Sequence, residues 1–249
     1  MIRLTTNKAL LESKTTISML NYGPNGSGKT YMIRTVPNPY NLFTERAAYG
    51  LAMKGFPVKG AVVETFEELR TEVKAIVDGK AAVGFDSICL DSLSELSGLV
   101  IKSVLGADRE PKGMSEWYHI KEQLKRFLIR ELINPIVDVI HKNLYVTARA
   151  AIVTDEDTKV VAGVPETIGQ LAYLVRGLFD ICVYSETRKR SIDGEMADVW
   201  ELHTRSKGFF FAKDTLDLCN SIEEPDFGAI LKKFQTKKAE MLKDSSLNY

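Results

Sequence analysis

Residues 23–30 read Gly23-Pro24-Asn25-Gly26-Ser27-Gly28-Lys29-Thr30, which is a complete G-x-x-x-x-G-K-T sequence. An apolar, β-prone run over Ile17–Tyr22 precedes it, and Lys29–Thr35 can form a helix after it. A strand, a glycine-rich loop and a helix in that order are the setting of a phosphate-binding loop. The sequence therefore predicts that this chain binds a nucleoside triphosphate.

The residue types of this loop suit a triphosphate. Glycines let the backbone curl until its N–H groups point at phosphate oxygens, and a following helix adds the positive end of its dipole. The ammonium of Lys29 can reach the β- and γ-phosphates, and the Thr30 hydroxyl can ligate Mg²⁺. We predict ATP and Mg²⁺ as the ligands, and the predicted nucleotide-binding residues are Gly23, Pro24, Asn25, Gly26, Ser27, Gly28, Lys29, Thr30 and Tyr31.

The composition is that of a globular protein without membrane segments. The chain has 249 residues, of which 45% are apolar, and this is enough to bury the core of one α/β domain. No run approaches the roughly 18 apolar residues that span a bilayer, and the polar beginning of the chain is unlike a signal peptide. The three widely spaced cysteines suggest neither a disulfide framework nor a zinc site, so we expect a cytoplasmic protein. Because the formal net charge is zero, a nucleic-acid site must be a local basic patch or a row of subunits.

Strand-like runs alternate with helical patterns, which predicts an α/β fold with a mostly parallel sheet, flanking helices and late β-hairpins. Pro225 marks the expected end of the core at residues 1–225, and residues 226–249 form a basic amphipathic helix and a tail. We expect that helix to dock on its own core, with a partner protein or DNA as the alternative contact. The expected strands are Ile17–Tyr22, Tyr40–Glu45, Ala61–Glu64, Ser87–Ser92, Asn143–Ala148 and Leu178–Tyr184. The expected helices are Phe66–Val77, Leu93–Val104, Glu116–Leu132 and Glu166–Arg176, and the hairpins turn within Ile152–Val161 and at Asp193-Gly194, the second leading into Val199–Thr204 and Phe209–Ala212.

Two carboxylates complete the predicted hydrolytic site. Asp91 ends an apolar strand, where an aspartate can order the metal together with Thr30. Motors of the AAA+ type carry a water-activating glutamate directly after this aspartate, but residue 92 is a serine. Glu45 closes another strand of the predicted parallel sheet, whose carboxyl end opens onto the same edge, so we assign it the role of catalytic base. Glu64 is the second candidate.

The order of these motifs resembles the RecA superfamily, over roughly Thr16–Lys213. A P-loop, a strand ending in Glu45, and an apolar strand ending in Asp91 follow one another as in that family. The chain most closely resembles the short, stand-alone RecA-core nucleotide-binding proteins of phages, some of which act as single-strand recombinases or annealing proteins. The resemblance implies a RecA-like ATPase that forms a ring or filament.

The resemblance also implies further site residues. Thr147 and Arg149 flank Ala148, which stands where RecA has a sensor glutamine, so sensing of the γ-phosphate would fall to these two neighbours. Arg205 and Lys207 lie where such ATPases place a cation that acts on a neighbouring subunit's nucleotide. Arg188-Lys189-Arg190 is a competing basic cluster.

Single-stranded DNA is the expected partner, because two loops lie where the family binds a strand. Asp108–Tyr118 combines Arg109 and Lys112 with Trp117 and Tyr118, whereas Arg149–Gly163 also carries an acidic run that would repel phosphate.

Two other classes remain open. One is a nucleotide-gated assembly or loader protein that acts on a protein partner, and the other is a different P-loop enzyme such as a small-molecule kinase. A GTPase is disfavoured, because the chain lacks an N-K-x-D motif.

Overall fold

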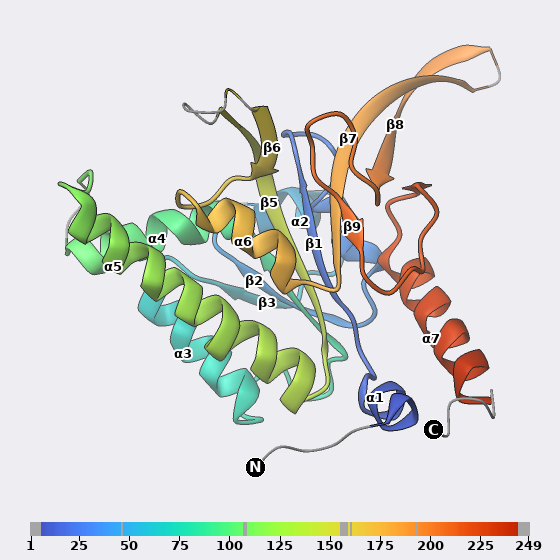
Figure 1. Ribbon diagram of the computed structural model, residues 1–249, viewed down its shortest axis with the longest axis horizontal. Coiled ribbons are helices and arrows are strands. Elements are labelled where there is room, and N and C mark those ends of the chain that lie inside the picture. The colour runs from blue at the N-terminus through green and yellow to red at the C-terminus, as the bar shows by residue number, and fades with distance from the viewer. Residues whose placement is uncertain are drawn as a thin grey trace.

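The computed structural model describes residues 6–45, 47–106, 109–154, 159, 161–192 and 194–243. Ten strands form one sheet with helices on both of its faces (Figure 1). The main path of the sheet runs β10-β8-β7-β1-β5-β4-β2-β3, with β6 paired to β5 and β9 paired to β7. The strands are β1 (Ser18–Gly23), β2 (Pro39–Phe43), β3 (Gly60–Val62), β4 (Ser87–Asp91), β5 (Asn143–Thr154), β6 (Val161–Pro165), β7 (Ile181–Ile192), β8 (Glu195–His203), β9 (Lys213–Asp214) and β10 (Ile222–Glu223).

The predicted α/β class with a mostly parallel sheet is confirmed. Strands β1 to β5 pair in parallel, and β7 joins β1 in the same direction. All residues of β1 and β4 are buried, as expected for central parallel strands covered on both faces. The antiparallel strands come late: β5 turns back into β6, and β7 turns back into β8 as a long arm that projects beyond the body in Figure 1.

Two apolar clusters cover the two faces of the sheet. One cluster joins the sheet to α3 (Phe66–Val77), α4 (Leu93–Leu105), α5 (Met114–Arg126), the π-helical turns η2 (Phe127–Ile133) and η3 (Pro135–Val139), and α6 (Leu171–Leu178). The other joins it to the 3₁₀ helix η1 (Tyr31–Thr35), α2 (Ala47–Met53) and α7 (Phe227–Lys243). Helix α1 (Asn7–Ser13) lies beside α7 at the bottom of Figure 1.

Most predicted elements are present, and the differences have local causes. Helix α3 has the predicted bounds because Thr65 and Glu68 form a capping box at its start. Helix α6 begins at Leu171 rather than Glu166, because the Glu166 N–H donates to the carbonyl of Arg149 instead. The segment Phe209–Ala212 is not a strand, since Phe210 makes only isolated bridges to Gly163 and Lys207. The acidic turn of the first predicted hairpin, at Asp155–Asp157, lies outside the described residues, as does Asp193.

The loop after β1 passes into a 3₁₀ helix rather than an α-helix. Helix η1 covers Tyr31–Thr35, and its buried residues Met32 and Ile33 pack in the second apolar cluster. Helix α7 covers this turn: the Phe227 N–H donates to the Thr35 hydroxyl at 2.9 Å, and the ring of Phe227 stands edge-on to Tyr145. The C-terminal helix therefore supports the segment that follows the phosphate-binding loop.

We predict that Phe227→Ala lowers the free energy of unfolding by about 3–5 kcal/mol. The side chain is 0% exposed, so truncation removes buried apolar surface and leaves a cavity beneath η1. Guanidinium denaturation measures the change, and Lys232→Ala, on the exposed face of the same helix, is the matched control. A loss below about 1 kcal/mol would show that residues 226–249 fold apart from the core.

Candidate functional site

Most of the predicted nucleotide- and metal-binding residues, with Glu45 and Arg149, meet at the carboxyl edge of the parallel strands, where α/β sheets bind ligands. Strand β1 delivers the loop 23–30, β2 leads to Glu45, β4 ends in Asp91 and β5 continues through Arg149. A cavity of about 410 Å³ lies between them. It is lined by Asn25, Gly26, Gly28, Lys29, Thr30, Tyr31, Glu45, Gly50, Lys54, Asp91, Ser92, Ala148, Arg149 and Trp200.

Lys29 is a half-buried cation held by its own loop. Its Nζ donates to the carbonyls of Gly23 at 2.9 Å and Pro24 at 2.7 Å. Burial lowers the pKa of Lys29 to about 8, although the negative charges of Asp91 and Glu45 act in the opposite direction. An anion in the cavity would compensate this desolvated charge, which the two carbonyl dipoles do only in part.

Asp91 is the buried anion of the site and is 2% exposed. One carboxylate oxygen accepts from the Thr30 hydroxyl at 2.8 Å, and the other accepts from Thr147. Burial raises the pKa of Asp91 to about 6, and the two hydroxyl donors limit that rise. The peptide bond that joins Asp91 to Ser92 is cis.

These residues fit a triphosphate with Mg²⁺. The Thr30 hydroxyl and the Asp91 carboxylate form an adjacent pair of oxygen ligands, the type that Mg²⁺ prefers. Gly26 and Gly28 both have positive φ angles, of 81° and 83°, which let the loop curl around a phosphate. The half-buried ammonium of Lys29 supplies the positive charge.

The structure separates the two candidate bases. Glu45 lines the cavity, and hydrogen bonds between Thr44 and Ser92 join its segment to the end of β4. Glu64 is exposed, and its N–H donates to Glu68 at the start of α3. Glu64 is not among the residues that line the cavity. The position of Glu45 is therefore the one compatible with contact to a bound phosphate.

The two candidate sensors have different surroundings. Thr147 lies behind Asp91 and donates to it, so it touches the carboxylate rather than the cavity. Arg149 lines the cavity, but its guanidinium pairs with Glu95 and Glu166, each at 2.5 Å. The hydrogen bond to Glu95 is the main reason that the pKa of Arg149 is raised. A phosphate in the cavity would therefore compete with two carboxylates for this guanidinium.

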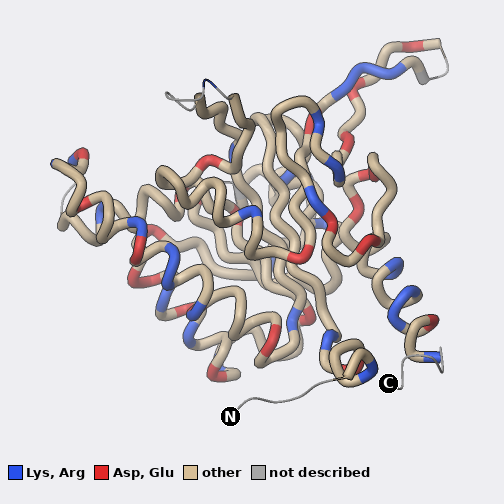
Figure 2. Tube along the Cα trace, in the orientation of Figure 1, with Lys and Arg blue, Asp and Glu red and all other residues tan. Residues whose placement is uncertain are grey.

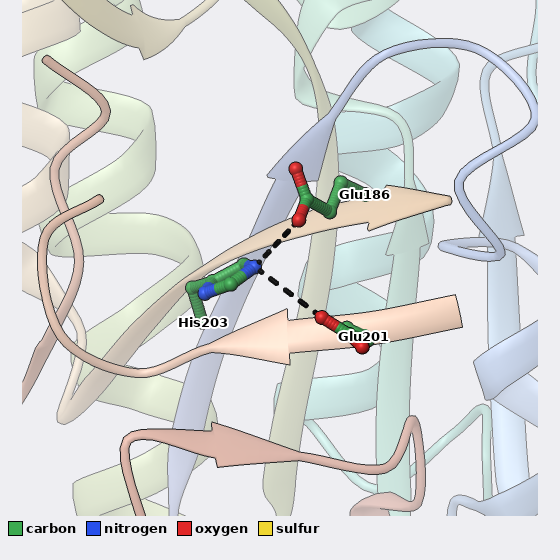
Figure 3. Close-up of side chains that lie close together, drawn as sticks. All are labelled: Glu186, Glu201 and His203. Atoms are coloured by element: carbon green, nitrogen blue, oxygen red, sulfur yellow. Dashed lines mark hydrogen bonds and ion pairs between the residues drawn. The ribbon is translucent and has the colours of Figure 1, made fainter. Parts of the chain in front are cut away.

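The candidate cations for a neighbouring subunit do not line this cavity. Arg205 pairs with Asp217 at 3.2 Å, and Lys207 pairs with Glu186 at the base of the β7–β8 arm. Figure 3 shows that Glu186 also meets His203, which lies close to Glu201. Although burial acts to raise it, hydrogen bonds from Lys207, His203 and Arg188 lower the pKa of Glu186 to about 2.

This cluster was not visible in the sequence. Glu186, Glu201 and His203 stand on paired antiparallel strands and lie close enough to hold a cation. The flanking side chains Arg188, Arg190 and Lys207 already pair with the two carboxylates. We therefore interpret the cluster as a network of ion pairs.

The sequence analysis also missed Trp200. This residue of β8 covers the phosphate-binding loop: its indole Nε1–H donates to the carbonyl of Gly26 at 3.0 Å. Its ring lies 4.8 Å from that of Tyr31, centroid to centroid. The apolar and polar alternation along β8 gave no signal that one side chain reaches back over 170 residues of sequence to this loop.

The predicted DNA-binding loop has its aromatic residues on the surface. Trp117 is 38% exposed and Tyr118 is 57% exposed, and Lys121 lies 5.5 Å from the Tyr118 ring. Arg109, in contrast, is paired with Glu116 at 2.7 Å. Asp108 lies outside the described residues. Figure 2 shows basic and acidic residues mixed along α3 and α5, and a run of basic residues in the β7–β8 arm.

Comparisons with known proteins identify the kind of domain. The family model of the AAA domain (AAA_24) matches residues 15–216. No curated protein matches the chain. Among solved structures, the flagellar accessory protein FlaH from Methanocaldococcus jannaschii is similar at 11% identity and a TM-score of 0.37, covering 80% of this chain and 86% of FlaH. A likeness this weak carries no information about activity. Within the described residues, no helix has the length and apolar character to cross a membrane.

We predict that Asp91→Asn stabilises the ligand-free protein at pH 7.5 by on the order of 2 kcal/mol. The folded-state pKa of about 6 exceeds the ordinary value of 3.8, so ionised Asp91 favours the unfolded state. That cost is fully present above pH 6 and is lost as the pH falls below 3.8, where the carboxyl is protonated in both states.

Chemical denaturation at pH 7.5 and at about pH 3, below the ordinary pKa, measures the difference. Asp86→Asn, at an exposed carboxylate before the same strand, is the control and should change stability little at either pH. Equal stability of Asp91→Asn and the unmodified protein at pH 7.5 would contradict the assignment of a desolvated charge.

Proposed function

Since this chain belongs to the AAA domain family of P-loop NTPases, we propose that it binds ATP with Mg²⁺ and hydrolyses the γ-phosphate. The observation that carries the proposal is the contact of Thr30 with Asp91 at 2.8 Å, beside the half-buried ammonium of Lys29. This arrangement places a hydroxyl, a carboxylate and a cation on one side of the same cavity. It is the donor set that a Mg²⁺-bound triphosphate requires.

Each residue has a defined part in the proposed reaction. Lys29 leaves the carbonyls of Gly23 and Pro24 and donates to phosphate oxygens. Thr30 and Asp91 would hold the metal ion, which would neutralise charge on the phosphates when bound. Glu45 orients the attacking water and accepts its proton. The negative charge of Glu45 adds to the effect of burial in raising the pKa of Asp91.

We propose Thr147 and Arg149 as the link between the γ-phosphate and the rest of the molecule. Thr147 fixes the Asp91 carboxylate, and Arg149 joins the cavity to α4 through Glu95 and to the segment after β6 through Glu166. In this proposal, a phosphate that contacts Arg149 competes with these two carboxylates and weakens their ion pairs. The bound state of the nucleotide thereby alters contacts outside the cavity.

We propose that hydrolysis takes place in a ring or filament of this chain. Arg205 and Lys207 are the candidate cations for the neighbouring subunit's nucleotide, and both are held by carboxylates in the single chain. On contact between subunits, the negative charge that develops on the neighbouring subunit's phosphate would have to replace the present partner of the cation. That partner is Asp217 for Arg205 and Glu186 for Lys207. Low turnover by the isolated chain is the expected consequence.

Single-stranded DNA is the proposed regulator, in recombination or annealing, as for the phage proteins that the sequence resembles. Trp117 and Tyr118 offer exposed aromatic faces for base stacking, and Lys121 and Lys112 offer charge nearby. The pairing of Arg109 with Glu116 favours a second candidate function, because it withdraws the arginine expected to contact phosphate. In that alternative, the exposed apolar residues around Met114 bind a partner protein, and hydrolysis is indifferent to DNA.

We predict that Glu45→Gln retains ATP affinity but lowers the rate of hydrolysis by about 10²- to 10⁴-fold, because the amide cannot accept the proton of water. Steady-state turnover and equilibrium binding of ATP measure the two effects. The matched control is Glu64→Gln, which should hydrolyse normally because Glu64 lies outside the cavity. Full activity in Glu45→Gln with loss in Glu64→Gln would reverse the assignment.

Lys29→Ala should lose tight ATP binding altogether.

We predict that single-stranded DNA raises ATP turnover, and that Tyr118→Ala weakens DNA binding by roughly 5- to 100-fold, the range expected for the loss of one stacked base. Binding should also weaken as the salt concentration rises. Tyr49→Ala removes an exposed tyrosine from α2, on the opposite face of the sheet, and serves as the control. Turnover that does not respond to DNA would favour the protein-partner alternative.

A further inference from the structure

The phosphate-binding cavity has an aromatic side that phosphate does not require. Tyr31 and Trp200 both line it, and both are half-buried, so part of each ring faces the open space. Phe56 stands edge-on behind Tyr31, with the ring centroids 5.5 Å apart. Three aromatic rings thus lie next to a loop whose other lining groups are polar or glycine. Such a surface fits a flat apolar group attached to the phosphates.

Trp200 is fixed in its position relative to the loop. Its indole N–H donates to the Gly26 carbonyl at 3.0 Å, and Thr187 on the paired strand donates to the same oxygen. The ring also lies directly against Gly28, where an added Cβ would come within 2.7 Å of it. Because one hydrogen bond and one close packing contact set its orientation, Trp200 presents a pre-organised ring and loses little entropy on binding a ligand.

Tyr31 follows Thr30 directly and lines the same cavity, next to Trp200. The guanidinium of Arg34 lies 3.7 Å from its ring centroid and stabilises the ring by a cation–π contact. The rings of Tyr31 and Trp200 are 4.8 Å apart and inclined at 58°, which leaves no room for a base between them. A base must therefore stack on the outer surface of the pair.

We propose that Trp200, supported by Tyr31, is the stacking platform for the nucleobase of the bound triphosphate. This proposal rests on the proposed nucleotide-binding function and assigns the base subsite to the β7–β8 arm. Stacking increases with the area of the ring system, so purine nucleotides bind more tightly than pyrimidine nucleotides. Stacking alone does not separate adenine from guanine. The alternative is that Trp200 only packs on the loop and holds its shape.

Equilibrium binding with three ligands separates the two roles. The ligands are ATP, CTP and inorganic tripolyphosphate, which carries the same charges but no base. We expect Trp200→Leu to lower the affinity for ATP by roughly 5- to 100-fold, since the stacking contact is lost. The affinity for tripolyphosphate should stay unchanged within about twofold, because this ligand has no base. Trp200→Phe keeps a ring but loses the N–H donor to Gly26, and it should recover most of the ATP affinity.

An equal loss of ATP and tripolyphosphate affinity in Trp200→Leu would overturn the proposal and assign Trp200 to loop support. Equal affinities of the unmodified protein for ATP, CTP and tripolyphosphate would also overturn it. Failure of the unmodified protein to bind any of the three would instead contradict the proposed nucleotide-binding function itself. These outcomes are distinct, so the base subsite and the phosphate site are tested separately.

A fluorescence measurement covers the case in which Trp200→Leu does not fold. The chain has two tryptophans, and Trp117→Phe leaves Trp200 as the single emitter. In that background, ATP should shield Trp200 from quenching by acrylamide, whereas tripolyphosphate should not. Shielding by both ligands alike would mean that the loop closes over Trp200 without a base, and would contradict stacking.

Discussion

The constraint on which this site depends is the desolvation of two opposite charges, the half-buried Lys29 after β1 and the buried Asp91 at the end of β4, on either side of β5. Both pKa values are displaced in the direction that burial dictates, downward for the ammonium and upward for the carboxyl. Their side chains are satisfied mainly by carbonyl and hydroxyl dipoles rather than by each other. Neither charge is fully compensated in the ligand-free protein, which lowers the free energy of unfolding. A ligand of complementary charge compensates them, so this free energy is gained when the ligand binds.

A chain of polar contacts in the core positions these charges. Ser185 of β7 donates to the Asn21 side chain in β1, and Asn21 donates to the Tyr145 hydroxyl of β5 at 2.9 Å. Tyr145 in turn donates to the carbonyl of Lys29 at 2.8 Å. These groups are buried between the sheet and η1, where an unpaired polar atom is costly, so each link constrains the next. The loop is therefore held from beneath by three adjacent strands as well as by its own glycines.

Sequence reasoning located the parts of the site that local chemistry determines. The loop 23–30 and the strand ending in Asp91 carry their function in consecutive residues, and a parallel sheet brings their ends to one edge. The contact of Trp200 with Gly26 depends instead on how far β8 twists over the loop, which no local pattern encodes. The same holds for Arg149, whose partners Glu95 and Glu166 come from a helix and a connection far along the chain. The 3₁₀ form of η1, which packs beneath α7, likewise could not be predicted from the sequence pattern.

The β7–β8 arm connects the nucleotide-binding loop to Lys207, a proposed cation for the neighbouring subunit's nucleotide. Next to the loop, Thr187 and Trp200 share the Gly26 carbonyl, and one residue before Thr187, Glu186 binds Lys207. Because Glu186 and Thr187 are adjacent, a shift of the arm that loosens one contact strains or loosens the other. Release of Lys207 towards a neighbouring subunit would thus be coupled to the packing of the arm on the nucleotide loop. The strongly lowered pKa of Glu186 means that this carboxylate stays ionised at neutral pH, so the release must be driven by a competing charge rather than by protonation.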